Sequence, residues 1–444
     1  MTRRKKHVRH DAQYEARKDG LYSISANGRG VKVGPPITHV GHASRENGSG
    51  AADIVQFLDK EGVERELCIP LAVTLGDRRK FTDTLIDGAY PVAGWPKAVL
   101  AVQAYLEAEH AKSKQHILIV KIGGWHGPHF LLGPTLISPN GMATGLRWDG
   151  PQLLAMEKFR VAGTLSKWQT RVARRCAYSS RMMFGLCLSF TAPLRALLDV
   201  EGGGFHNHGA PESAKTAGLI AAGSVFGGGE KNGHYVPWAM TDAGAETLCL
   251  IHNDVLLCLD ELDRFDTDPV RGAKRLGPMV LDISGEGSRT ISHRASIASS
   301  PVKGALFLSS GNSAAMQYVA KTGQEPIPGM ASRIVDIPLP AEGEMGMFDR
   351  LPNNKKTGQP FDHSDYARLI AVASLKNYGH AGHIYLQKLV QERHDDPVRL
   401  KRYLLDRMNY FTAKTRDAVP AGYDQRVVRR FALNRPGFAG GSNS

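Results

Sequence analysis

Residues 209–216 have the types and spacing of a loop that binds phosphate. A glycine is followed by four residues, a small residue, a lysine and a threonine: Gly209, Ala210, Pro211, Glu212, Ser213, Ala214, Lys215 and Thr216. In such a loop, backbone N–H groups surround a phosphate and the next helix presents its positive end to it. Lys215 would reach the β- and γ-phosphates of ATP, and Thr216 would hold Mg²⁺. The alternative is a glycine-rich surface turn before a helix.

Ala214 departs from the simple pattern, which has glycine before the lysine. If this position requires a positive φ, alanine costs roughly 1–2 kcal/mol there. The flanking sequence fits the loop on both sides. Residues 205–208 predict a short strand that leads into it, and residues 215–225 are small and apolar. We therefore expect a helix after the loop that packs closely on a sheet.

An acidic pair supplies the second half of such a site. Residues 255–259 form a continuous apolar run, which is typical of a strand buried on both faces of a parallel sheet. Asp260 and Glu261 follow at its carboxyl end, where α/β sheets bind ligands. Asp260 would hold Mg²⁺, and Glu261 would polarise the attacking water. Without the phosphate loop, the same pair would indicate only solvated acids at a strand end.

Two later segments complete the candidate catalytic set. Residues 305–312 predict a third buried strand that ends in small polar groups, and Asn312 would sense the γ-phosphate or hold the water. Arg333 stands just before a fourth strand at 334–337. An arginine supplied to a neighbouring subunit's ATP is worth roughly 10³–10⁵ in rate in enzymes that use one. The alternative for Arg333 is an ordinary surface arginine.

These motifs together resemble the AAA+ ATPases of the minichromosome-maintenance type. Those helicases also carry alanine or serine at the position of Ala214. Residues 259–264 resemble their acidic strand end, and Ser332-Arg333 resembles their Ser-Arg finger. In such rings a hairpin near residues 284–303 reaches the central pore, so the resemblance implies that Arg289 and Arg294 contact DNA.

Roughly residues 20–433 resemble domain-of-unknown-function family 927, which comprises helicase-like P-loop ATPases of phages, plasmids and cassette elements. The matching runs, besides the nucleotide motifs, are Gly124–Gly127, Gly163–Trp168, Gly203–His206, Trp238–Thr241 and Asn253–Asp254. Fuller relatives continue beyond residue 433 with more helix. Residues 434–444 are instead rich in glycine, serine and asparagine, which puts unwinding in more doubt than ATP binding.

The expected fold is α/β, with a P-loop NTPase core of AAA+-like type built on a parallel sheet. An α+β accessory domain precedes the core and a helical lid follows it, with Arg426, Arg429 or Arg430 as phosphate contacts. The expected boundaries are a basic flexible arm at 1–20, the accessory domain at 21–180, the core at 181–345, the lid at 346–433 and a flexible tail at 434–444.

Composition bounds the partners. The formal net charge of +13 and the pI near 9.5 suggest a polyanionic partner. Together with the ATPase motifs, they make DNA the leading candidate for that partner, with RNA as the alternative. The longest apolar stretch, at 182–198, contains Pro193 and Arg195, so we expect no membrane span. Five scattered cysteines indicate reduced thiols in a cytoplasmic protein. His126 and His129 lack partners at metal-ligand spacing and predict a packed turn instead.

The sequence thus predicts an ATP-dependent motor of a mobile element or phage, moving on or unwinding DNA. The resemblance adds a homo-oligomer, with a hexameric ring as one form. The alternative is a nucleotide-dependent DNA-binding or assembly module that does not unwind.

Overall fold

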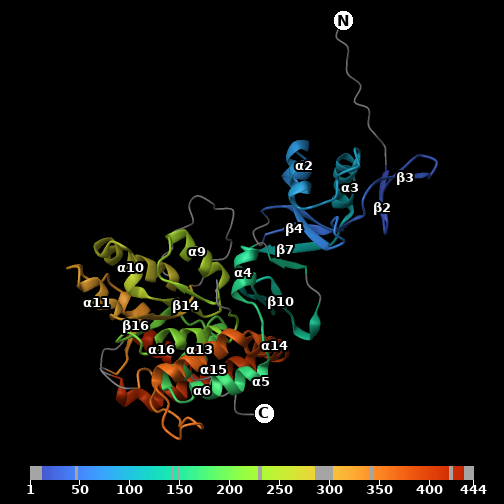
Figure 1. Cartoon of the computed structure of the whole chain (residues 1–444). Helices are drawn as coiled ribbons and strands as arrows, with labels where there is room; N and C mark the ends of the chain where they lie inside the picture. Colours follow the sequence, from blue (N-terminus) through green and yellow to red (C-terminus); the bar gives the residue numbers. More distant parts are fainter. Residues whose placement is uncertain are drawn as a thin grey trace. The chain divides into compact units, whose positions relative to one another are not determined.

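The computed structural model describes residues 13–45, 49–142, 145–148, 150–228, 233–285, 304–340, 345–419 and 424–434 (Figure 1). The chain divides into two compact units. The smaller unit comprises residues up to Val120 together with 144–147, and the larger unit comprises 121–143 and 148 onwards. The accessory unit therefore ends some 60 residues before the expected boundary at 180, and the C-terminal helices belong to the same unit as the parallel sheet.

The smaller unit is built on two sheets. An antiparallel sheet contains β1 (Gln13–Arg17), β2 (Gly20–Ile24) and β3 (Gly30–Gly34). A mixed sheet has the order β11-β7-β4-β5-β6, with bounds Leu146–Trp148, His116–Val120, Ile37–Ser44, Ala52–Leu58 and Glu64–Pro70. The helices are α1 (Leu71–Thr74), α2 (Arg78–Asp87) and α3 (Ala98–Lys112). Phe57, Phe81 and Val102 belong to its hydrophobic core.

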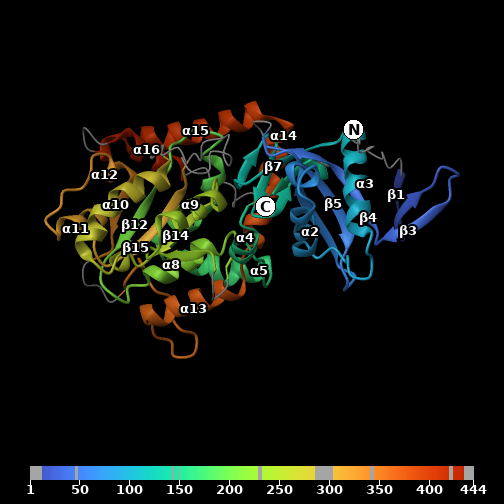
Figure 2. The same ribbon diagram turned by 90° about the horizontal axis from the view of Figure 1, so that it is seen from above.

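The larger unit is organised on a five-stranded parallel sheet. Its strands are β12 (Gly203–His208), β13 (Tyr235–Pro237), β14 (Leu257–Asp260), β15 (Leu306–Gly311) and β16 (Ile334–Pro338), in the order β13-β14-β15-β12-β16. The strands β12, β14 and β15 are buried almost along their whole length. Apolar runs buried on both faces favour parallel pairing, as the sequence predicted. Figure 2 shows the sheet between layers of helices.

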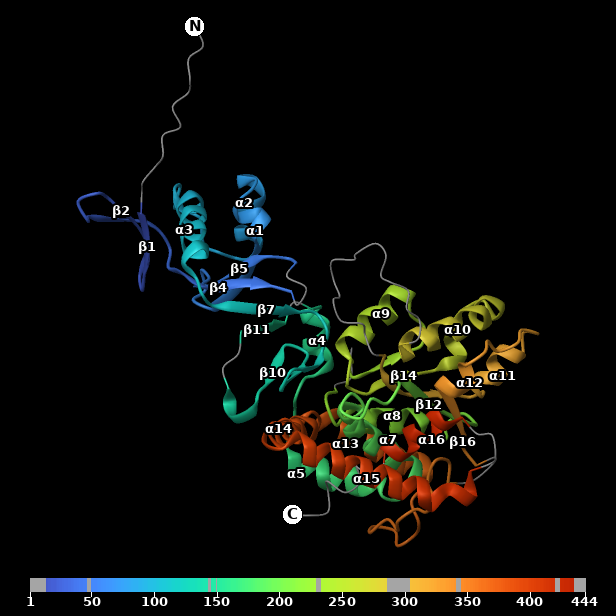
Figure 3. The ribbon, with the colours of Figure 1, turned by 180° about the vertical axis from the view of Figure 1, so that it is seen from behind.

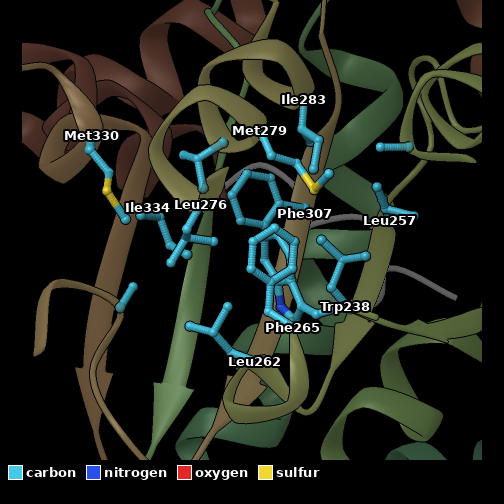
Figure 4. Packing of buried hydrophobic residues seen from close by; sticks show 14 of the residues in the cluster. Trp238, Leu257, Leu262, Phe265, Leu276, Met279, Ile283, Phe307, Met330 and Ile334 are labelled. Atoms are coloured by element: carbon cyan, nitrogen blue, oxygen red, sulfur yellow. The ribbon is translucent and has the colours of Figure 1, made fainter. Parts of the chain in front are cut away.

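Helices cover both faces of this sheet. The helices α9 (Asp242–Ile251), α10 (Pro269–Ser284), α11 (Ala315–Ala320) and α12 (Met330–Arg333) pack on one face. Figure 4 shows this core, where Leu276 and Met279 of α10 meet Phe307 of β15. On the other face, α7 (Ser180–Thr191) and α8 (Lys215–Gly223) enclose Phe205. Close packing of α8 follows from its small residues.

The remaining elements complete the larger unit (Figure 3). A small sheet has the order β10-β9-β8, with bounds Thr135–Ile137, His129–Leu132 and Gly124–His126. In the sequence, the main sheet is preceded by α4 (Gln152–Lys158), α5 (Leu165–Trp168), a π-helical turn (Gln169–Ala173) and α6 (Arg174–Cys176). It is followed by α13 (His363–Lys376), α14 (His380–Asp395), α15 (Pro397–Thr415) and α16 (Gln425–Leu433). Short 3₁₀ turns occur at Pro139–Gly141, Ala192–Leu194, Leu262–Arg264 and Arg416–Ala418.

A side-chain cap begins the helix α15. The Asp396 carboxylate accepts a hydrogen bond from the Arg399 N–H at 2.9 Å, and Pro397 occupies the first turn. Leu404 and Met408 are buried in one cluster. Of the helices within the described ranges, none has the length and apolarity that crossing a bilayer requires. The five cysteines are free thiols, and four of them are buried.

Candidate functional site

The phosphate-loop residues connect the end of β12 to the start of α8. The backbone of Ala214 is left-handed, with φ at 72° and ψ at 14°, and Glu212 also has a positive φ of 60°. The condition set for Ala214 by the sequence is therefore met, and alanine carries a cost of roughly 1–2 kcal/mol there. This turn brings Lys215 to the first position of the helix. The Thr216 side chain beside it is exposed.

The Lys215 ammonium turns back onto its own loop. Its Nζ donates to the carbonyl oxygens of Gly209 at 2.9 Å and Ala210 at 2.5 Å, and to the Ser213 hydroxyl at 3.1 Å. Lys215 is 9% exposed. Burial lowers the pKa of the ammonium, while the carboxylates of Asp263 and Asp260 oppose that shift. The loop thus encloses one positive charge with oxygen ligands, at the start of a helix.

The acidic strand end lies two strands away along the same sheet edge. Asp260 is the last residue of β14 and is buried, and its Oδ1 accepts hydrogen bonds from the Ser310 hydroxyl and from the Glu261 N–H. Since β15 lies between β14 and β12 and all three are parallel, their carboxyl ends meet at one edge. The structure therefore brings Lys215, Asp260 and Asn312 to the same edge.

Glu261 occupies a strained position beyond Asp260. Its φ is 59°, in the left-handed region, and its carboxylate accepts a hydrogen bond from the exposed Arg264 at 3.1 Å. The Glu261 side chain is about half exposed, at 49%. Non-glycine residues held in this region cluster at active sites and ligand clamps. Glu261 is thus accessible to solvent, whereas Asp260 is enclosed.

Asp263 and His206 hold the loop that contains Asn312, and sequence reasoning missed both. The Asp263 carboxylate accepts from the N–H groups of Asn312 and Ser313. His206 Nε2 lies 2.9 Å from the Ser313 carbonyl, and its Nδ1 lies 2.8 Å from the Ser309 hydroxyl. Since a carbonyl only accepts, the Nε2 carries the proton and Nδ1 accepts from Ser309. The family-like runs at 259–264 and 203–206 contain Asp263 and His206, but they gave no sign of the contacts with the Asn312 loop, because those partners are distant in sequence.

A segment that follows β16 flanks the phosphate loop. The Ser179 hydroxyl donates to the Met347 carbonyl at 2.7 Å, and Asp349 accepts from the Ser180 N–H at 2.6 Å. A Cβ added to Gly346 would lie 3.0 Å from the Ser213 carbonyl oxygen, so the backbone passes close to the loop. These contacts bind the start of α7 and residues 346–349 together beside the candidate nucleotide site.

Arg333 lies at the opposite edge of the sheet and is completely buried. It precedes β16, its Nη1 donates to the Ser332 hydroxyl at 2.9 Å, and its Nη2 lies 3.4 Å from the Glu201 carboxylate. An arginine that acts on a neighbouring subunit must present its guanidinium at the surface. Arg333 does not do so in this structure, because its side chain fills space beside the start of β12. The alternative of a surface arginine also fails.

The arginines of α16 require a similar correction. Arg430 is 1% exposed, and it donates to the carbonyls of Gly202, at 2.8 Å, and Ser332. Burial lowers its pKa to about 10, and Arg333 adds to that shift. Arg426 pairs with Asp424 at 3.0 Å. Since β12 is six residues long, these groups lie about 17 Å from the phosphate loop, so Arg426 and Arg430 do not form a lid over it.

The runs Gly124–Gly127 and Asn253–Asp254 contact each other directly. The Trp125 N–H donates to Asp254 at 3.2 Å, and the Asn253 amide donates to the Gly123 carbonyl at 2.9 Å. A Cβ added to Gly124 would lie 2.5 Å from the Asp254 carboxylate, so only glycine fits there. Asp254 also forms a buried ion pair with Arg195 at 3.3 Å. These runs are structural and fasten the β8–β9 hairpin to the start of β14.

The other family-like runs also fix the packing. Trp168 donates through its indole N–H to the Ser224 hydroxyl at 2.8 Å, and Trp238 does the same to Ser309 at 2.7 Å. A Cβ added to Gly204 would lie 2.2 Å from the Phe307 ring. These residues support the sheet and are not part of the candidate site.

Two further predictions concern ligands. His126 bonds to the Ile122 carbonyl at 2.8 Å and His129 to the Ser138 hydroxyl at 3.0 Å, as expected for a packed turn. Within the described ranges, no group of three or more His, Cys, Asp or Glu residues is arranged to hold a metal ion. Arg289 and Arg294, the candidate DNA contacts, lie outside the described residues.

Comparison with known proteins agrees with this architecture. Residues 15–294 match the family described as domain of unknown function (DUF927). A solved structure of SCCmec type IV Cch, an active helicase, superimposes with a TM-score of 0.67 at 14% identity, covering 95% of this chain and 72% of that one. The apo NrS-1 C-terminal region covers 87% of this chain and 80% of its own at 11% identity, but its TM-score of 0.31 carries no argument. No curated protein matches the sequence.

Proposed function

The chain belongs to the DUF927 family, and we propose that it is an AAA+-like ATPase that hydrolyses ATP to move on or unwind DNA. The observation that carries the proposal is the convergence of Lys215, Asp260 and Asn312 at the carboxyl edge of the parallel strands β12, β14 and β15. The strand order, with β15 between the loop-bearing strand and the acidic strand, supports an AAA+-like assignment. The fold shared with a helicase is consistent with it.

The residues present fit ATP and Mg²⁺. The Lys215 ammonium already binds three oxygens of its own loop, so phosphate oxygens suit it as ligands. The exposed Thr216 hydroxyl and the Asp260 carboxylate are the hard oxygen donors that Mg²⁺ prefers. When bound, ATP supplies the phosphoanhydride whose cleavage drives movement. Lys215 offers positive charge to the phosphates, Glu261 orients and polarises water, and Asn312 holds that water or the γ-phosphate.

The proposal is tested by ATP hydrolysis with and without single-stranded DNA, at low and moderate salt. We expect DNA to stimulate the wild type, with less stimulation as salt rises. Lys215→Ala should lose roughly 10²–10³-fold in turnover, as when one preorganised donor is removed from an active site. Glu261→Gln should bind ATP as the wild type does but turn it over slowly. Lys274→Ala, an exposed lysine of α10, is the matched control.

Normal hydrolysis by Glu261→Gln would contradict the role given to Glu261. Absence of turnover in the wild type would reduce the loop to a binding site. The second candidate is a nucleotide-dependent DNA-binding or assembly module without unwinding. The burial of Arg333 favours it, because a buried guanidinium is not presented to a neighbouring subunit. Strand displacement on a forked duplex separates the two, since only a motor separates strands with ATP. Formation of a homo-oligomer is part of the first candidate, and light scattering with ATP tests it.

A further inference from the structure

The helix α15 has an exposed face on which positive charges alternate with tyrosines. Arg399, Tyr403, Arg407, Tyr410 and Lys414 follow one another at intervals of four, four, three and four residues, and all five are exposed. This spacing places them on one side of an α-helix. At 1.5 Å per residue, the row is about 22 Å long. We call this set of five residues the α15 row.

The α15 row is held on a fixed support. Leu404 and Met408, on a neighbouring face of the same helix, are 4% and 5% exposed and pack with Leu389 and Leu433. Figures 2 and 3 both show α15 along the outside of the larger unit. The row is therefore a surface of the folded unit, with its side chains directed away from the core.

The tyrosines of the row are unusually exposed and pair with its cations. Tyr403 is 44% exposed and Tyr410 is 49% exposed. The Arg407 guanidinium lies 5.2 Å from the centre of the Tyr403 ring, and the Lys414 ammonium lies 5.8 Å from that of Tyr410. At these distances each cation is attracted to the face of its tyrosine ring, so positive charge and aromatic surface lie together in the row.

The charge of the helix indicates a polyanionic partner. Between residues 397 and 419 the sequence has six lysines and arginines against two aspartates, and all eight are exposed. Positive charge alone would fit any polyanion. The aromatic rings between the cations favour a single nucleic-acid strand among the polyanions. Its bases can stack on the rings while its phosphates pair with the charges. A duplex hides its bases and gives the tyrosines no such contact.

We propose that the α15 row binds single-stranded nucleic acid, with Tyr403 and Tyr410 stacking on bases and Arg399, Arg407 and Lys414 contacting phosphates. This inference rests on only one part of the proposed function, namely that the partner is a nucleic acid. The ATP site is not required, since the row belongs to the outer surface of α15. Binding is therefore expected without nucleotide.

The test is fluorescence anisotropy of the full chain, without nucleotide, on a labelled oligothymidine of about twenty nucleotides, longer than the roughly 4–16 that one single-strand-binding fold covers. Tyr403→Ala and Tyr410→Ala should each weaken binding about five-fold or more. Tyr403→Phe with Tyr410→Phe keeps the rings and should bind within about two-fold of the wild type. Circular dichroism and thermal melting check that each variant is folded.

A second pair of variants tests the cations. Arg407→Gln with Lys414→Gln should reduce the slope of log affinity against log salt by about 1.4, since each phosphate contact to a single strand contributes about 0.7. Lys355→Gln with Lys356→Gln removes two exposed lysines elsewhere in the same unit and should leave the slope almost unchanged. Heparin, a polyanion without bases, should compete through the cations but be insensitive to the tyrosine changes.

The outcomes separate this inference from the proposed function. Unchanged oligothymidine binding in a variant that combines Tyr403→Ala with Tyr410→Ala would overturn the inference, even if ATP is hydrolysed. Equal losses for oligothymidine and heparin in that variant would also overturn it, because stacking would not be involved. Specific loss of oligothymidine binding would support it, even in a chain that hydrolyses no ATP.

Discussion

The two edges of the parallel sheet in the larger unit differ in what they do with their polar residues. At the carboxyl edge, Ala214 and Glu261 have left-handed backbones, and Glu261 and Thr216 are exposed. At the amino edge, Arg333, Arg430 and Asp254 are buried and bonded to neighbouring segments. Asp254 also has a left-handed backbone, with φ at 58°, so solvent access and not backbone strain separates the two edges. The carboxyl edge is open to a ligand, whereas the amino edge holds paired charges that fix the fold. Whether a polar residue suits ligand binding or stabilises the fold therefore depends on the edge of the sheet at which it lies.

The largest expected effect is a loss of stability when Asp254, at the amino edge, is replaced. Asp254→Ala leaves the Arg195 guanidinium buried without this ion pair, and breaking a buried pair in this way costs roughly 3–5 kcal/mol. Urea unfolding followed by fluorescence of Trp125, Trp168 and Trp238 measures the loss. Asp417→Ala, at an exposed aspartate, should change stability by less than about 0.5 kcal/mol. Similar stabilities for the two variants would contradict a structural amino edge.

A pH change tests the same edge through His234. This buried side chain lies 2.8 Å from the Leu256 carbonyl, and burial lowers its pKa to about 4. The unfolded chain, with an ordinary pKa near 6.5, binds the proton more readily, so stability falls as pH falls from 6.5 towards 4. We expect a loss of about 2 kcal/mol between pH 7 and pH 5.

The His234→Gln variant is the control for this pH effect. Glutamine keeps a donor for the Leu256 carbonyl but does not titrate, so the variant should lose less stability over the same interval. Urea unfolding at both pH values provides the comparison. Equal losses in the variant and the wild type would show that His234 is not the group responsible.

Arg333→Gln tests whether an arginine at the amino edge acts in catalysis. If its role is structural, the variant should lose roughly 1–2 kcal/mol of stability, as expected for a buried polar contact that is removed. Its ATP turnover per folded molecule should stay within about ten-fold of the wild type. A loss of roughly 10³-fold or more would instead restore the arginine-finger role.

The smallest expected effect lies in the strained loop at the carboxyl edge. Ala214→Gly removes the left-handed alanine but gives the unfolded chain more freedom, so we expect a net gain of about 0.5–1 kcal/mol. Ala217→Gly, inside the helix α8, should instead lose about 1 kcal/mol. Thermal melts of the two variants should therefore shift in opposite directions. A loss of stability in Ala214→Gly would show that the left-handed backbone of Ala214 does not destabilise the folded chain.

The sequence predicted elements well where the signal is local. The apolar runs at β14 and β15 and the short strand at β12 form as expected, because strand patterns depend on near neighbours. The position of Lys215, Asp260 and Asn312 at one edge also followed, since parallel strands place their carboxyl ends together.

The sequence failed where partners are distant. Arg430 bonds to Gly202, more than two hundred residues earlier, and Asp254 to Trp125, more than one hundred earlier. Spacing along the chain does not indicate such distant pairs. The sequence therefore predicts ligand contacts for Arg333 and Arg430, which the structure buries. The division into compact units at Val120 also depends on distant partners, because Asp254 and Pro193 bond to Trp125 and hold its hairpin within the larger unit.

The hydrogen bonds from Lys215 to its own loop have a consequence for how tightly a ligand binds. They order the loop before any ligand arrives, so its conformational entropy is lost during folding and not during binding. A phosphate must then replace the carbonyl oxygens of Gly209 and Ala210 as the partner of the ammonium. The binding enthalpy is the difference between two sets of charge-assisted bonds, and it should be modest. Selectivity among nucleotides would then depend on how much negative charge each brings to this exchange.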